Sequence, residues 1–166
     1  MDLYVLRHAI AGDRKLFDGP DSERPLTNQG AKKMKLIAKE MKKLDLKFDV
    51  ILSSPFLRAK QTAEIVAKEF HCESSLKFSS HLRVGGDPAA LVHEINTGYR
   101  KFDRILLVGH EPYLSGFISM LVSGKKDLSI TMKKGGLCKL SVDSLQYGRC
   151  AGLEWLMAPA QMIRDK

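Results

Sequence analysis

The chain has 166 residues, and 44% of them are hydrophobic, which is enough for one domain with a single buried core. It contains no run of about 18 apolar residues, which a membrane span would need, and it begins without a signal-peptide pattern. We therefore expect a single domain over residues 1–166, located in the cytoplasm and without a membrane partner.

Charge and cysteine content narrow the function classes further. The formal charge of +8 comes largely from lysines, and it indicates either a solvated basic face or an anionic partner. Nucleic acid is disfavoured as that partner, because aromatic residues are only 7% of the chain and no RNA-binding signature or zinc finger is present. A phosphorylated substrate or an acidic protein surface would use the same positive field. The three cysteines show no CxxC spacing, which predicts neither a disulfide framework nor a zinc site.

The first predicted element is a short buried strand, Leu3 to Leu6, which ends on Arg7 and His8. A loop rich in turn-forming residues follows over 18–25. Thr27 then has the pattern of an N-cap, and apolar residues at helical spacing after it predict an amphipathic helix. The lysines between these apolar residues account for much of the positive charge.

The next strand and helix bring an arginine to a position just past the end of a strand, as the first strand does for Arg7 and His8. Residues 49–53 are predicted to form a strand, and Ser54 with Pro55 is typical of an N-cap followed by the first residue of a helix. Arg58 falls in the first turn of this helix, where the helix dipole disfavours a cation. A residue that breaks a local rule is a candidate for function, and an ion pair with a loop carboxylate is the alternative explanation.

The second half of the chain continues the alternation of strands and helices. The predicted elements are a strand over 76–78, a helix capped by Asp87, a strand over 105–108, a helix opened by Pro112, and strands over 137–142 and 153–157. The strand over 105–108 ends on Gly109 and His110. The last two strands have a short connection and must therefore be antiparallel neighbours.

This order of elements predicts an α/β fold with three layers, in which helices cover a mostly parallel central sheet with an antiparallel edge. The carboxyl ends of parallel strands share one edge of the sheet, and ligands bind at that edge in open α/β sheets. We therefore expect Arg7, His8, Arg58 and His110 to meet there.

Two arginines beside two histidines suit a phosphoryl group. Guanidinium matches phosphate oxygens and keeps its charge, and imidazole can attack phosphorus near pH 7 and later leave again. We assign His8 as the nucleophile and place Arg7, Arg58 and His110 around the equatorial oxygens of the transferred group. The arginines should lower the pKa of His8, which keeps the attacking nitrogen unprotonated.

Four motifs together resemble the signature of the histidine phosphatase superfamily, also called the phosphoglycerate-mutase-like fold. They are Leu6-Arg7-His8, Arg24-Pro25-Leu26-Thr27-Asn28-Gln29-Gly30, Ser54-Pro55-Phe56-Leu57-Arg58-Ala59-Lys60-Gln61-Thr62-Ala63 and Gly109-His110. Within the superfamily the short chain is most similar to SixA-type phosphohistidine phosphatases. The resemblance implies a phosphohistidine intermediate on His8, a phosphate pocket of Arg7, Arg58 and His110, and no metal or other cofactor.

Two departures from the family pattern bear on the reaction. Ala9 stands where the family has glycine, and it would be strained if the backbone angle there needed glycine. The acidic proton donor of larger members has no counterpart over 80–86. The residues that could replace that donor are Asp13, Asp18, Asp21, Glu23 and Glu111. Glu111 is equally well explained by its place at a helix amino terminus.

We expect a metal-independent phosphatase that acts through phosphorylated His8. A phosphoramidate releases nitrogen more easily than a phosphoester releases alkoxide, so a missing acid favours phosphohistidine on another protein as the substrate. The alternatives are a phosphatase of small phosphomonoesters, such as sugar or nucleotide phosphates, and a phosphate-binding module without turnover.

Overall fold

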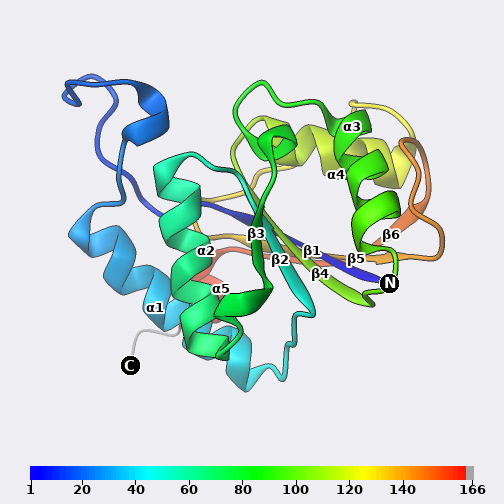
Figure 1. Cartoon of the computed structure of the whole chain (residues 1–166), viewed down its shortest axis with the longest axis horizontal. Coiled ribbons are helices and arrows are strands. Elements are labelled where there is room, and N and C mark those ends of the chain that lie inside the picture. Colours follow the sequence, from blue (N-terminus) through cyan, green and yellow to red (C-terminus); the bar gives the residue numbers. More distant parts are fainter. Residues whose placement is uncertain (164–166) are drawn as a thin grey trace.

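The computed structural model describes residues 1–163, which form a six-stranded sheet with helices on both of its faces (Figure 1). Three 3₁₀ turns and a short π-helix, Ile95–Tyr99, connect some of the elements. The strands and α-helices are β1 (Asp2–Arg7), α1 (Asn28–Lys43), β2 (Val50–Ser53), α2 (Leu57–Phe70), β3 (Leu76–Phe78), α3 (Pro88–Glu94), β4 (Arg104–Gly109), α4 (Tyr113–Ser123), β5 (Leu137–Val142), β6 (Ala151–Met157) and α5 (Pro159–Met162).

The sheet has the strand order β3-β2-β4-β1-β5-β6. Strands β3, β2, β4 and β1 pair in parallel, whereas β5 is antiparallel to both β1 and β6. This arrangement confirms the predicted α/β fold with an antiparallel edge. The four parallel strands bring their carboxyl ends to one edge.

Both faces of the sheet are covered, because the central strands are apolar on both sides. Leu3 and Val5 of β1 belong to a core that includes residues of α3 and α4, whereas Tyr4 and Leu6 belong to a second core with α1 and α2 (Figure 1). Burial of each such side chain contributes roughly 1.5–3 kcal/mol to folding. Among residues 1–163, no helix is long and apolar enough to cross a membrane.

Two of the predicted helix caps are confirmed, and one is wrong. The Thr27 hydroxyl accepts a hydrogen bond from Gly30 N–H, and the Asp87 carboxylate accepts from two amides in the first turn of α3. The predicted cap at Ser54 is wrong, because α2 begins only at Leu57. The amide of Ser54 still bonds across the sheet to Val108, so the chain remains extended there and turns into the helix later.

Candidate active site

The parallel register brings two histidines and a serine to one edge of the sheet. Arg7 at the end of β1 pairs with Gly109 at the end of β4, and His8, the residue after β1, donates its amide to the Gly109 carbonyl at 3.0 Å. Ser54 follows β2 and donates its amide to Val108 at 2.9 Å. The rings of His8 and His110 therefore lie with their centroids 5.1 Å apart.

The protonation of His8 follows from its hydrogen bonds. Its Nδ1 lies 2.7 Å from the carbonyl oxygen of Ala9, which can only accept, so Nδ1 carries the proton and Nε2 keeps a lone pair. Arg58 Nε donates to that lone pair at 3.3 Å. Burial is the main cause that lowers the pKa of His8 to about 3; the Ala9 hydrogen bond opposes the shift, and the arginines add to it. The expected lowering of the His8 pKa by the arginines is present, but burial is the larger cause.

Arg58 is the second residue of α2 and is buried. Its Nη1 donates to the carbonyl oxygen of Asp21 at 2.7 Å, and its Nη2 donates to the Asp21 carboxylate at 2.9 Å. The loop carboxylate considered as an alternative partner of Arg58 is thus present. Because Nε of the same guanidinium faces His8, the ion pair orients Arg58 toward the histidine instead of withdrawing it.

His110 is held by the hydroxyl of Ser54. Its Nε2 lies 2.8 Å from Ser54 Oγ, which also accepts a hydrogen bond from Phe56 N–H at 3.2 Å. Ser54 Oγ can donate its proton to Nε2 while it accepts from Phe56 N–H, and in that arrangement the His110 proton lies on Nδ1. Burial is the main cause that lowers the pKa of His110 to about 3, and the neighbouring His8 and Arg58 act in the same direction. Both histidines are therefore neutral near pH 7.

Two polar atoms at the site have no partner among the described residues. They are Nδ1 of His110 and Nε of Arg7. Arg7 Nη1 donates to the carbonyl of Met132 at 2.8 Å, so this guanidinium is fixed by the segment before β5. Buried polar atoms are nearly always paired, and two such nitrogens at one sheet edge indicate a place for an anion that accepts hydrogen bonds.

The motif residues around the site tie its segments together. The amide of Ala9 donates to the Thr62 hydroxyl at 3.0 Å, and the amide of Leu26 donates to the Gln61 side chain at 2.8 Å. A Cβ atom on Gly30 would lie 2.0 Å from the carbonyl oxygen of Ile10, so only glycine lets α1 approach so closely.

Ala9 itself is not strained by its position. Among residues 1–163, the residues other than glycine with positive φ are Asp45 and His71, both remote from Ala9 in sequence. Alanine therefore takes the place of the family's glycine without needing a left-handed backbone.

Several contacts could not be predicted from the sequence. The pairing of Asp21 with Arg58 joins positions 37 residues apart, and that of Ser54 with His110 joins positions 56 apart. Gly135, which has positive φ, donates its amide to the carbonyls of Arg7 and His8 at 3.1 and 3.2 Å and closes the site from the β5 side. The Lys-Lys-Gly-Gly sequence before β5 was the available signal for a tight turn.

The acidic residues considered as proton donors differ in their suitability. Asp13, Asp18 and Glu23 are exposed on the loop before α1. Burial alone would raise the pKa of Asp21, but hydrogen bonds and charge from Arg24 and Arg58 outweigh it and lower that pKa. Asp21 is therefore held as a carboxylate and is a poor acid. Glu111 is half-buried, and its Oε1 accepts a hydrogen bond from Ser115 N–H at 2.8 Å.

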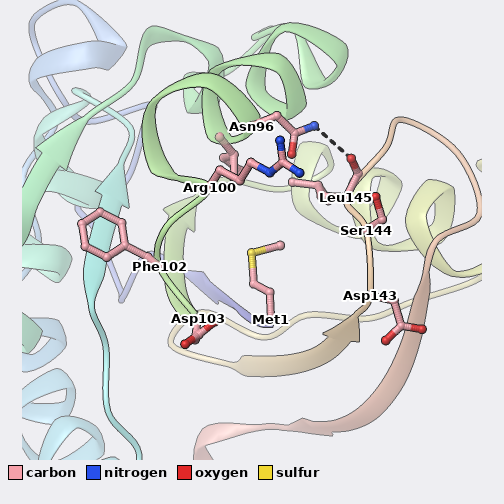
Figure 2. A pocket seen from close by; sticks show the side chains of 9 residues that line it. Met1, Asn96, Arg100, Phe102, Asp103, Asp143, Ser144 and Leu145 are labelled. Atoms are coloured by element: carbon pink, nitrogen blue, oxygen red, sulfur yellow. Dashed lines mark hydrogen bonds between the residues drawn. The ribbon is translucent and has the colours of Figure 1, made fainter.

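A cavity of about 470 Å³ lies at the opposite edge of the sheet, and Figure 2 shows its lining side chains. Met1 and Asp103 line it, and they immediately precede β1 and β4, so the cavity lies at the amino ends of the parallel strands. Asn96 crosses one side and donates to the carbonyl of Leu145 at 2.9 Å (Figure 2). None of the four predicted site residues lines this cavity. Within residues 1–163, no group of three or more His, Cys, Asp or Glu side chains is placed to hold a metal ion.

The fold is that of a class of enzymes that handle phosphoryl groups. A family model described as "Histidine phosphatase superfamily (branch 1)" matches residues 3–83. An uncharacterized protein of Picosynechococcus sp. is 33% identical over 147 residues, which is 84% of each chain. The chain belongs to the histidine phosphatase superfamily, and it is a phosphatase.

The chain is also similar to phosphohistidine phosphatase SixA of Escherichia coli strain K12, with 28% identity over 170 aligned positions that cover 100% of this chain and 99% of that protein. The structure of a protein histidine phosphatase SixA complexed with tungstate superposes with a TM-score of 0.85 and 25% identity, covering 98% of this chain and 100% of the other. An α-ribazole-5'-P phosphatase of Escherichia coli shares the fold, with a TM-score of 0.76, 16% identity and coverage of 97% and 98%.

Proposed function

We propose that this phosphatase removes the phosphoryl group from phosphohistidine on proteins, through a phosphohistidine intermediate at His8. The observation that carries the proposal is the hydrogen bond from His8 Nδ1 to the carbonyl of Ala9, which leaves Nε2 unprotonated and directed at Arg58. The low pKa of His8, about 3, supports the same role, because a neutral imidazole is the nucleophilic form.

In the proposed reaction, His8 Nε2 attacks phosphorus and the bond to the substrate nitrogen breaks. Arg7, Arg58 and Nδ1–H of His110 donate to the three equatorial oxygens, where negative charge is greatest in the transition state. Water then attacks phosphorylated His8, the electron pair of the breaking bond returns to Nε2, and phosphate leaves. The cations are supplied by side chains, so the reaction is proposed to be independent of metal ions.

The choice of a phosphohistidine substrate rests on the leaving group. Asp21 lies beside Arg58 but is held as a carboxylate by its arginine partners, which makes it a poor donor of the proton that an alkoxide requires. A phosphoramidate releases nitrogen more readily. The name of the similar Escherichia coli protein, a phosphohistidine phosphatase, supports the same substrate.

Hydrolysis of small phosphomonoesters is the second candidate. The structural relatives include an α-ribazole-5'-P phosphatase and a phosphoserine phosphatase from Entamoeba histolytica, whose likeness at 16% and 14% identity concerns the fold. The third reading, a phosphate-binding module without turnover, has less support because the chain is a member of a phosphatase superfamily.

One experiment separates the three candidates. The purified protein is incubated with a protein labelled on phosphohistidine and, in parallel, with a panel of sugar and nucleotide phosphates. The expected result is an acid-labile, alkali-stable label on the enzyme that is absent in His8→Ala, together with faster turnover of the phosphohistidine protein. Faster turnover of the small esters would overturn the proposed substrate, and the absence of both label and turnover would overturn catalysis.

A further inference from the structure

A second cavity shares a wall with the candidate active site. It has a volume of about 350 Å³, and His110 and Glu111 line it together with residues of α3 and α4. Pockets that bind small ligands begin at roughly 300 Å³. This cavity is therefore large enough for the group that carries the phosphate, on condition that the phosphoryl group itself lies at His8 and His110.

The walls of the cavity suit a flat ring. Pro88, Tyr113 and Phe117 all line it, and the last two rings stack at a centroid distance of 6.2 Å and an interplanar angle of 20°. Gly116 keeps the side of α4 open, because a Cβ atom there would meet only Lys126 Cδ, at 3.8 Å. Aromatic and proline surfaces stabilise a planar ring by stacking and by excluding water.

Glu111 brings a negative charge to this mostly apolar cavity, which His110, Tyr113 and Lys126 also line. Its Oε1 accepts the hydrogen bond from Ser115 N–H that caps α4, and no partner for Oε2 is recorded among residues 1–163. The same carboxylate acts on Arg7, whose pKa burial lowers and Glu111 raises. Glu111 thus lines the cavity beside His110, and its charge acts on an arginine of the proposed phosphate pocket.

We propose that this cavity binds the imidazole ring that leaves the phosphoryl group, and that Glu111 accepts a hydrogen bond from the ring nitrogen that does not carry phosphorus. The inference rests on the proposed function and adds the subsite for the leaving group. A cationic N-protonated ring matches a carboxylate set between aromatic walls, because both charge and shape are complementary.

The step balances without an acid. The phosphorylated ring enters with a proton on its distal nitrogen, which donates to Glu111. His8 Nε2 forms the new bond to phosphorus, the old P–N bond breaks, and its electron pair stays on the ring nitrogen. The ring departs as neutral imidazole with the distal proton still in place, and Glu111 remains a carboxylate. An alkoxide would lack this proton, so the same carboxylate would not assist its departure.

The test uses two small donors that both contain a P–N bond. Phosphoimidazole has the ring, and phosphoramidate does not. Glu111→Gln should lower kcat/KM for phosphoimidazole by roughly ten- to hundredfold, and for phosphoramidate by less than about twofold, because only with the first donor does a charge-assisted hydrogen bond become a weaker, neutral one. Glu154→Gln on the exposed face of β6 is the matched control and should change neither.

The cavity is tested separately from the charge. Gly116→Leu should extend into the open space and reduce phosphoimidazole turnover selectively, whereas Gly98→Leu, at a helical glycine with nothing within 4 Å, is its control. Decay of the phosphorylated enzyme should be unchanged in Glu111→Gln, because the ring has already left. If Glu111 only capped α4, Glu111→Gln would instead lower kcat/KM for both donors to the same extent.

Equal losses with the two donors would overturn the subsite and leave the phosphatase mechanism standing. If wild-type protein formed no phosphoenzyme with either donor, the proposed function would fall, and this inference with it.

Discussion

Two buried neutral histidines make the stability of this protein depend on pH. Burial is the main cause that lowers the pKa of His8 and that of His110 from the ordinary 6.5 to about 3, and the side chains are 5% and 1% exposed. In the unfolded chain both imidazoles regain their ordinary pKa and take up protons below it. The unfolded state therefore binds more protons between these values, and folding stability falls as the pH is lowered.

The size of the effect follows from the unfolded pKa, provided that the folded value stays below 5. Between pH 7 and pH 5 each histidine should cost about 2 kcal/mol of unfolding free energy, and the pair should cost about 4 kcal/mol. Urea denaturation at the two pH values and constant ionic strength measures this difference. His8→Gln or His110→Gln should leave about half of the loss, and the double variant should abolish most of it.

His93→Gln, at an exposed position on α3, is the control substitution and should keep the wild-type difference. A wild-type protein that lost less than about 1 kcal/mol over this range would refute the burial argument for both histidines. A loss that persisted in the double variant would assign the pH dependence to other groups.

Three further predictions concern Ser54, Gly30 and independence of metal ions. Ser54→Ala should lower the free energy of unfolding by about 2 kcal/mol and reduce phosphohistidine turnover, because it leaves a buried ring nitrogen of His110 unpaired. Ser53→Ala removes a similarly buried hydroxyl and should lower stability alone. Equal activity in the two variants would contradict this prediction. Gly30→Ala should lower the melting temperature by about 4–8 °C because its Cβ meets a backbone oxygen, while Gly98→Ala should not; thermal unfolding decides. EDTA should leave phosphohistidine turnover unchanged, and a loss that a divalent cation restores would refute the metal-independent mechanism.

The sequence was sufficient for the parts of the site that follow from regular structure. Apolar runs that end on Arg7-His8 and on Gly109-His110 predict two strands, and parallel pairing then places their ends together, as the register of β1 and β4 confirms. Arg58 follows from the same logic, because the turn after β2 leads directly into α2.

The partners of these residues depend on contacts that no local pattern encodes. Ser54 has the sequence of a helix cap, and only the folded chain shows that its hydroxyl is used by His110. Asp21 lies in an irregular loop, where neither periodicity nor turn chemistry predicts which of several arginines it will meet. Side chains of opposite charge are easy to count in a sequence, but their pairing is a property of tertiary structure.

The tautomer of His8 is chosen by the main chain. Its proton partner is the carbonyl oxygen of Ala9, an atom that every amino acid carries, so no substitution at position 9 deletes it. Position 9 can therefore be glycine or alanine while the proton stays on Nδ1 and leaves Nε2, the proposed nucleophile, unprotonated. The tautomer of His8 is therefore unaffected by the side chain at position 9, and substitutions there can change substrate preference without changing that tautomer.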